Sequence, residues 1–234
     1  MKVLYEGKAK VVFELEDPDL LLIEFKDTAS AFNRKKLGVI EDKGRINARM
    51  SALLFQLVEK GGIPTHFVEL KGDNQMIVKR LQMLPVEVVV RNKVAGSLAR
   101  RLGLKEGLAI SEPLCEFYYK SDELGDPLVT RQHIRVFGWA TQEQIDEMCR
   151  YALKVDGVLS KFFDSIGIEL IDYKLEFGVF KGRLLLGDEL SPDGMRLWDK
   201  ATGKKLDKDR FRFDMDGVKE AYEEVLKRII SGIK

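Results

Sequence analysis

The N-terminal third of the chain alternates hydrophobic and polar positions in short runs separated by turn residues. Residues 3–25 follow the two-residue period of strands and are interrupted at Gly7 and at Asp17-Pro18. The same pattern predicts further strands at residues 66–70, 75–81 and 86–92. Residues 82–85, QMLP, are expected to link two lobes, because proline interrupts the hydrogen bonding of a sheet.

Three longer stretches repeat apolar residues with the period of an α-helix. Residues 45–62 form the first, and Gly61 is expected to end it. Thr141 and Gln144 have the spacing of a capping box and predict the start of a second, long helix. Residues 216–230 predict an amphipathic helix near the end of the chain. Because strands and helices are grouped rather than strictly alternating, the pattern predicts an α+β fold.

Composition narrows the class of protein. The chain has 234 residues, with 39 Lys and Arg against 38 Asp and Glu, so its net charge is +1. This balance predicts no general attraction to nucleic acid or to a membrane surface, and any anion site must be local. The two cysteines, Cys115 and Cys149, lack metal-ligand spacing and are typical of a reducing compartment. With no apolar run of membrane-spanning length, we expect a soluble cytoplasmic protein.

Two acids near residues 175–194 are candidates for a metal site. Asp172, Lys174 and Glu176 alternate with apolar residues and therefore share one face of a strand. If the following loop has three residues, 181–183, Glu176 stands directly opposite Asp188 on that face. A two-residue loop would place the two acids on opposite faces.

Like charges placed directly opposite destabilise a strand pair unless a cation lies between them. Carboxylates of this kind suit Mg²⁺, which binds one or two carboxylates together with phosphate oxygens. Lys174 could instead offset part of the repulsion without a metal. From the spacing alone, both interpretations remain open.

Three further segments carry candidate anion-binding residues. Lys8 and Lys10 lie two apart after Gly7 and are therefore expected on one strand face, where a glycine-hinged hairpin could bring both to nucleotide phosphates. The alternative, which the sequence alone favours, is an ordinary hairpin with solvated lysines. Arg91 ends an apolar strand. Residues 96–104 predict a short helix ended by Gly103, whose start at Gly96-Ser97 could bind phosphate with Arg91 or could be an ordinary cap beside a salt bridge.

Arg196 follows the predicted Asp193-Gly194 turn. It is expected to point toward whatever Asp188 binds, or to be solvated.

Taken together, these segments resemble the SAICAR synthetase (phosphoribosylaminoimidazole-succinocarboxamide synthase) family. The resembling motifs occur in the family's order and cover nearly the whole chain: YEGKAK (5–10), LPVEVVVRNKVAGS (84–97), Asp126-Pro127, DYKLEFG (172–178), LGDELSPDGMRLWD (186–199) and DKDRFR (207–212). The resemblance implies a ligase that joins L-aspartate to the carboxylate of carboxyaminoimidazole ribonucleotide (CAIR) with ATP and Mg²⁺. It also implies a two-lobed α+β arrangement, similar to kinases and ATP-grasp proteins, with ATP between lobes at 1–84 and 85–234.

The resemblance also assigns roles to individual residues. Those implied for ATP are Lys8, Ala9, Lys10, Lys79, Met83, Glu87, Glu176 and Asp188. Those implied for the ribonucleotide phosphate are Arg91, Ser97 and Arg196. Glu176 and Asp188 are implied as metal ligands on the ATP side, and Asp126 as a metal ligand near the second substrate's carboxylate. Lys174 is implied to contact transferring phosphate or aspartate, which makes Lys174 and Asp126 the candidate catalytic residues.

The chain departs from the family pattern at two positions. Asn33 stands where relatives often have aspartate, and Gly125 precedes Asp126 where many relatives have histidine. Asn33 brings no negative charge, and Gly125 would matter if the histidine orients a substrate. The family also implies a homo-oligomer.

Two other functions compete with the ligase. A kinase acting on a small alcohol or sugar phosphate would share the two-lobed layout, but no segment resembles the HRD or DFG kinase signatures. A nucleotide-sensing module without turnover would have less use for the intact acids and lysines.

Overall fold

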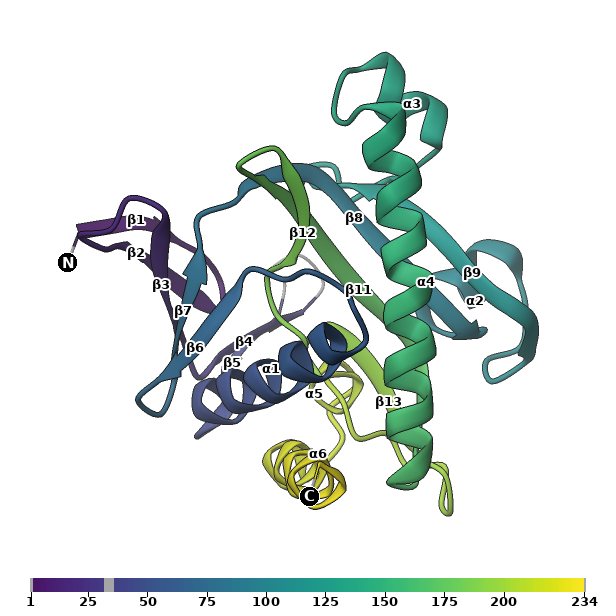
Figure 1. Cartoon of the computed structure of the whole chain (residues 1–234). Helices are drawn as coiled ribbons and strands as arrows, with labels where there is room; N and C mark the ends of the chain where they lie inside the picture. The colour runs from purple at the N-terminus through teal and green to yellow at the C-terminus, as the bar shows by residue number, and fades with distance from the viewer. Residues whose placement is uncertain (1, 32–35, 234) are drawn as a thin grey trace.

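The computed structural model describes residues 2–31 and 36–233, so Asn33 lies outside the described residues. The N-terminal part of the described chain forms an antiparallel sheet with the order β1-β2-β3-β7-β6 (Figure 1). Its strands are β1 (Lys2–Glu6), β2 (Lys10–Glu14), β3 (Leu20–Phe25), β6 (Phe67–Lys71) and β7 (Gln75–Lys79). A short ladder pairs β4 (Thr28–Ala31) with β5 (Lys36–Val39). The strands predicted in this region are confirmed.

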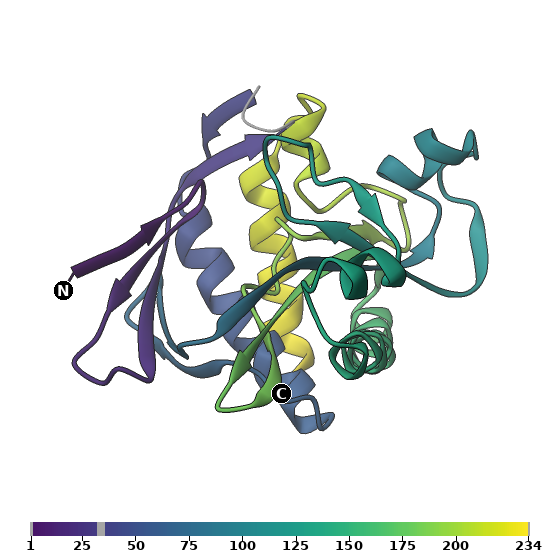
Figure 2. The same cartoon turned by 90° about the horizontal axis from the view of Figure 1, so that it is seen from above.

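Helix α1 (Lys43–Lys60) packs against this sheet and contacts β3, β6 and β7. Its prediction is confirmed: the helix ends at Gly61 and buries an apolar stripe of Ile46, Met50, Leu54 and Val58. It also packs against α6 (Val218–Gly232), the predicted last helix, and Figure 2 shows these two helices side by side.

The second sheet is also antiparallel and has the order β10-β9-β8-β11-β12. Its strands are β8 (Gln82–Lys93), β9 (Ala109–Tyr119), β10 (Leu128–Val129), β11 (Ile168–Phe180), β12 (Arg183–Gly187) and β13 (Met195–Asp199). Along one edge of β11, its first half pairs with β13 and its second half with β12, while β8 follows the other edge. The α+β prediction is confirmed, because the ladders between the described strands are antiparallel and the helices lie outside them.

Helix α4 (Gln142–Ser165) covers one face of the second sheet, where it contacts β8, β9 and β11 (Figure 1). Its predicted capping box is present: the Thr141 hydroxyl accepts from the Gln144 N–H, and the Gln144 side chain accepts from the Thr141 N–H. The remaining helices are short: α2 (Gly96–Leu102), α3 (Arg131–Val136) and α5 (Asp209–Arg212).

The QMLP segment, expected to link two lobes, lies within strand β8. Pro85 lies inside β8, close to an irregularity in the pairing of β8 with β11, where a residue without an N–H is tolerated. The chain instead passes from one sheet to the other between Lys79 and Gln82. In the described part of the chain, one buried apolar cluster takes side chains from both sheets and from α1, α4 and α6.

Candidate active site

The hairpin of β11 and β12 closes with a two-residue loop. Phe180 pairs with Arg183, and Lys181 and Gly182 have φ angles of 49° and 78°, the positive pair of a type I′ turn. The three-residue alternative is therefore wrong, and Glu176 pairs with Gly187 rather than with Asp188.

The expected consequence of a two-residue loop, acids on opposite faces, is also wrong. Asp188 follows the last residue of β12 and has a φ of 60°, so the alternation of the strand has ended before it. This turn of the backbone lets Asp188 line the same cavity as Glu176. Neither strand spacing nor loop length alone could have predicted this arrangement.

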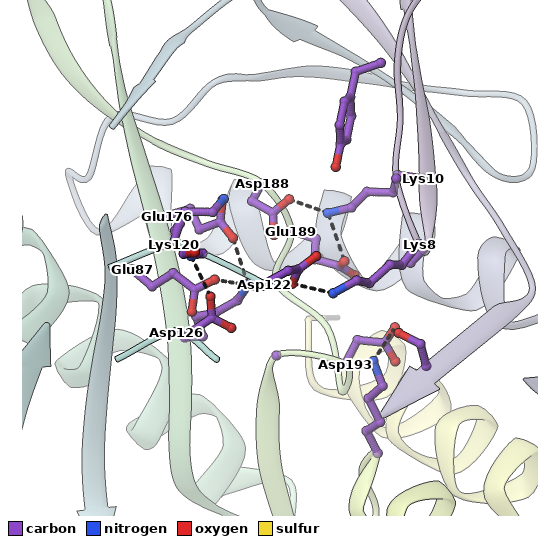
Figure 3. Close-up of a pocket in the computed structure, with 18 residues that line it drawn as sticks. Lys8, Lys10, Glu87, Lys120, Asp122, Asp126, Glu176, Asp188, Glu189 and Asp193 are labelled. Atoms are coloured by element: carbon purple, nitrogen blue, oxygen red, sulfur yellow. Dashed lines mark hydrogen bonds and ion pairs between the residues drawn. The ribbon is translucent and has the colours of Figure 1, made fainter. Parts of the chain in front are cut away.

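Figure 3 shows this cavity, which has a volume of about 440 Å³. Lys8 and Lys10 enter from the N-terminal hairpin, whereas Glu87 and Glu176 enter from the second sheet. Predicted residues that line it are Lys8, Ala9, Lys10, Glu87, Asp126, Lys174, Glu176 and Asp188. Lys120, Asp122, Glu189 and Lys208 line it as well. None of these four is assigned a role of its own by the sequence, although the stretch 105–120 and the motif DKDRFR (207–212) are candidates for the aspartate site. The cavity is therefore crowded with both signs of charge.

Lys10 bridges two acids of the loop after β12. Its Nζ contacts an Asp188 oxygen and lies 2.9 Å from Glu189 Oε1. Burial alone would lower the pKa of Lys10, but these two carboxylates raise it above its usual range. In the same contact, burial would raise the pKa of Asp188, and Lys10 lowers it instead. Both groups are therefore charged at neutral pH.

On the opposite wall, Lys174 lies between two glutamates. Its Nζ is 2.9 Å from Glu87 Oε1 and 2.8 Å from Glu176 Oε1, and Lys120 contacts the other oxygen of Glu176. Burial and Asp188 would raise the pKa of Glu176, but Lys174 and Lys120 together lower it. Burial raises the pKa of Glu87 despite its contact with Lys174. Lys174 therefore offsets part of the repulsion between the acids, the alternative to a metal ion that the sequence left open.

The two N-terminal lysines do not lie on one strand face. Lys10 begins β2, whereas Lys8 belongs to the turn after Gly7. Lys8 Nζ is 2.5 Å from Asp122 Oδ1, so the tip of the hairpin contacts the loop after β9. The two lysines nevertheless line the same cavity.

A second cavity, of about 420 Å³, adjoins the first. Glu87, Asp126, Lys174, Asp193, Gly194 and Lys208 are among the residues that line both. The predicted phosphate residues Arg91, Ser97 and Arg196 line only the second cavity, together with Arg212. The residues predicted for ATP that line the first cavity and those predicted for the ribonucleotide phosphate thus lie in neighbouring cavities. Lys174 and Asp126 line both cavities.

Most of the N–H groups of Arg91 donate to other side chains of the protein. Its Nε donates to Glu116 at 2.6 Å and its Nη1 to Asp172 at 2.8 Å, while Nη2 donates to both Ser97 Oγ and Tyr118 at 2.9 Å. An arginine has five N–H groups, so four of them are already used. The proposed cap is wrong, because Ala95 is the N-cap of α2 and the Ser97 hydroxyl accepts from Arg91.

Arg196 does not point toward Asp188. Its Nη1 donates to both oxygens of Asp172 at 3.0 and 2.9 Å, and its Nε donates to Asp209 Oδ2 at 2.9 Å. Burial would lower the pKa of Arg196, but Asp172 and Asp209 raise it further above its usual range. Asp172 thereby joins Arg91 to Arg196, a role that its strand position alone could not reveal.

Two predicted nucleotide residues lie outside the residues that line these cavities. Lys79 Nζ donates to the Thr65 carbonyl at 3.1 Å. Met83 is exposed, and its side chain lies near the place that a Cβ on Gly187 would occupy.

The loop before β10 is sharply bent, with φ angles of 74° at Gly125 and 50° at Asp126. Asp126 Oδ1 accepts from the Ser121 N–H at 2.9 Å.

The acids fit a divalent cation in kind. Glu176 and Asp188 present carboxylate oxygens to one cavity. The charge of Asp188 acts to raise the pKa of Glu176, a repulsion that a cation between the two acids would relieve. Within residues 2–31 and 36–233, no group of three or more His, Cys, Asp or Glu is arranged to hold a metal ion. Any Mg²⁺ here would thus need oxygens from its substrate as well as from this pair.

Adjoining cavities, one with acids and lysines and one with arginines, are typical of an enzyme that binds two phosphorylated substrates. Comparison with known proteins defines the family. Residues 3–229 match the family model described as SAICAR synthetase. Proteins named phosphoribosylaminoimidazole-succinocarboxamide synthase are 55% identical in Magnetococcus marinus (97% of this chain, 95% of the relative) and 53% identical in Desulfitobacterium hafniense (100% and 98%). The chain belongs to the SAICAR synthetase family and is a ligase of purine biosynthesis.

Solved structures agree with this assignment. The phosphoribosylaminoimidazole-succinocarboxamide synthase of Ehrlichia chaffeensis superposes with a TM-score of 0.96 at 41% identity, over 97% of this chain and 98% of that one. A SAICAR synthetase in complex with ADP superposes with a TM-score of 0.93 at 48% identity, over 96% of each chain. Among the described residues, no helix is long and apolar enough to cross a membrane.

Proposed function

We propose that the two adjoining cavities hold ATP and CAIR next to each other, and that the chain joins L-aspartate to the CAIR carboxylate with release of ADP and phosphate. The observation that carries this proposal is the junction: Lys174 and Asp126 line both the acid-lysine cavity and the arginine cavity. A phosphoryl group bound in the first cavity would thus face a carboxylate bound in the second.

ATP occupies the cavity under the N-terminal hairpin. Lys8 and Lys10 face the phosphates with the backbone of Ala9, and the adenosine lies toward Lys79, Met83 and Glu87. In support, the three hairpin residues and Glu87 line this cavity, and a relative of 48% identity binds ADP. The contact between Lys8 and Asp122 suits a lid, because ATP phosphates would compete with Asp122 for the lysine.

Glu176 and Asp188 would hold Mg²⁺ on the ATP side, and Asp126 would hold a metal near the second substrate's carboxylate. When bound, Mg²⁺ would neutralise charge on the transferring phosphate. Lys10 and Lys120 contact these acids and would lie beside the phosphate oxygens of a nucleotide bound in the same cavity.

The CAIR phosphate lies in the arginine cavity. Arg196 is the main ligand there, because its Nη2 is free of the carboxylates that hold its Nε and Nη1. Ser97 adds its hydroxyl. Arg91 contributes chiefly by fixing Ser97 and Asp172, since one N–H remains for substrate. Binding energy from this remote phosphate holds the reacting carboxylate in line with ATP.

The reaction proceeds in two steps. An oxygen of the CAIR carboxylate attacks the γ-phosphorus of ATP, the bond to the bridging oxygen breaks, and ADP leaves. The amine of L-aspartate then attacks the acyl phosphate carbon, the bond to the phosphate oxygen breaks, and the proton given up by the amine passes to the released phosphate. Lys174 stabilises charge on the transferring phosphoryl group from its place at the junction. Closure of the hairpin excludes water, which would otherwise hydrolyse the acyl phosphate.

The division at residues 84 and 85 into lobes with ATP between them, and the kinase-like or ATP-grasp-like arrangement, belong to the same proposal. Assembly as a homo-oligomer and a cytoplasmic location remain predictions.

The test is ADP release from the purified protein with MgATP, with CAIR and L-aspartate added separately and then together. Release that needs both substrates supports the ligase and its site. Release with CAIR alone, together with SAICAR formation once aspartate is added, supports an acyl phosphate that water can reach. No release under any combination would overturn the proposal.

A further inference from the structure

Helix α1 carries a polar stripe inside the protein. Lys43, Asn47 and Ser51 are spaced four residues apart and therefore share one face of the helix. Each is at most 1% exposed, although this helix otherwise buries apolar residues. Lysine is almost never fully buried without a partner, so a buried lysine on a core helix calls for an explanation.

Ser51 holds the loop that follows β12. Its hydroxyl donates to the Leu190 carbonyl at 3.2 Å and accepts from the Leu190 N–H at 3.3 Å. Both polar groups of one loop residue are thereby fixed to α1. Leu190 is two residues from Asp188 and next to Glu189, so these bonds act directly beside the acids that contact Lys10.

Lys43 holds the far end of the same loop. Its Nζ is 2.9 Å from Asp193 Oδ2, and the hydroxyl of Tyr222 on α6 donates to Asp193 Oδ1 at 2.7 Å. The next residue, Gly194, accepts at its carbonyl from the Lys174 N–H at 2.8 Å. Through the Asp193-Gly194 turn, Lys43 therefore helps to fix the backbone of Lys174, the lysine at the junction of the two cavities.

Stability alone does not explain these contacts. Removing a lysine and an aspartate from water costs several kcal/mol per ion in general, and well-packed apolar residues often stabilise a core as well or better. What an ion pair and a pair of directed hydrogen bonds add is a defined position for the loop.

We propose that Lys43 and Ser51 are positioning residues, which fix both ends of the loop 188–194 so that Asp188 meets the metal and Lys174 meets the transferring group. This inference rests on the proposed function, since it takes the metal at Glu176 and Asp188 from there. Asn47 shares the face, but its side-chain amide has no hydrogen-bond partner in the described part of the chain, and it is not part of the proposal.

The main test uses Ser51→Ala and measures ADP affinity by calorimetry, once with Mg²⁺ and once with a chelator. The ratio of the two affinities reports how well the metal is held, whether or not the enzyme turns over. We expect Ser51→Ala to lower this ratio roughly threefold to tenfold, the effect of losing one or two hydrogen bonds. Ser160→Ala is the matched control, because it removes a helix hydroxyl that donates to Asp156 at 3.1 Å, away from both cavities.

Lys43→Met tests the other end of the loop. We expect kcat for ADP release to fall by roughly tenfold or more while the KM for MgATP changes less, because Lys174 rather than the nucleotide is disturbed. This variant leaves the buried Asp193 with Lys208, at 3.7 Å, as its remaining lysine partner. If the variant fails to fold because that pairing is weaker, Ser51→Ala decides.

The possible results separate the two proposals. An unchanged ratio in Ser51→Ala, or an equal drop in Ser160→Ala, overturns the positioning role and leaves the proposed function intact. If the unaltered protein does not bind ADP with or without Mg²⁺, the proposed function fails and the inference fails with it.

Discussion

At the residue scale, Asp188 is where the geometry and the sequence motif agree most closely. We expect Asp188→Asn to lower kcat by roughly 100-fold or more, because several kcal/mol of charge stabilisation by a metal would be lost. Lys10 loses one of its two carboxylate partners but keeps Glu189, so the fold should survive. Steady-state ADP release, with circular dichroism as the check on folding, measures this. Near-normal turnover would remove Asp188 from the metal site.

The buried carboxyl of Asp207, close to the arginine cavity, predicts how the stability of the fold depends on pH. It is fully buried, and burial together with Asp209 raises the pKa of its carboxyl to about 7, against about 3.9 in an unfolded chain. The folded protein therefore binds this proton more tightly. The resulting stability is complete below about pH 3.9 and is lost as the pH rises through about 7.

We expect Asp207→Asn to flatten the fall in the free energy of unfolding between about pH 5 and pH 8, measured by urea unfolding at several pH values. The slope is the readout, because the amide also disturbs the bonds from the Leu197 and Asp209 N–H groups. The exposed Asp164→Asn serves as the control. An unchanged slope in Asp207→Asn would contradict the raised pKa.

At the element scale, the start of α2 is shaped to admit an arginine. Gly96 has a φ of 53°, and a Cβ on it would lie 2.3 Å from Nη2 of Arg196. We expect Gly96→Ala to raise the KM for CAIR by roughly tenfold with a smaller effect on kcat, since it displaces the proposed phosphate ligand.

Gly103→Ala is the matched control for that variant. Gly103 lies at the other end of α2 with a φ of 64°, so alanine meets similar backbone strain, but nothing lies within 4 Å of its Cβ. Equal changes in the KM for CAIR in the two variants would show that strain, rather than displacement of Arg196, is responsible.

Elements with a local signal could be predicted from the sequence. The capping box at Thr141 and the apolar period after it locate α4 because both signals lie within the helix itself. The loop of β11 and β12 could not be placed, because Lys181 is not a residue that marks a positive φ.

Contacts between distant segments could not be predicted from the sequence. Asp172 joins Arg91 to Arg196 across three strands, and Lys43 meets Asp193 from 150 residues away, so no local pattern indicates either contact. The family motifs indicated which residues matter, whereas the partners that hold them required the fold.

At the scale of the whole molecule, the continuous core predicts that the chain unfolds as one unit. Buried side chains of β3 and β8, in different sheets, belong to one cluster with α1 and α4 in the described part of the chain. A division at residue 84 and 85 into lobes that fold separately would instead give two transitions.

The tryptophans make this measurable. Trp139 and Trp198 are the chain's two tryptophans and both follow residue 85, so their fluorescence reports on the C-terminal part, whereas far-ultraviolet circular dichroism reports on the whole chain. We expect the two urea transitions to coincide. Because MgADP is proposed to bind residues of both parts, a concentration 100 times its Kd should stabilise the folded state by about 2.7 kcal/mol and shift both signals together. Transitions that separate, or a shift in one signal alone, would mean that the two parts unfold independently despite their shared core.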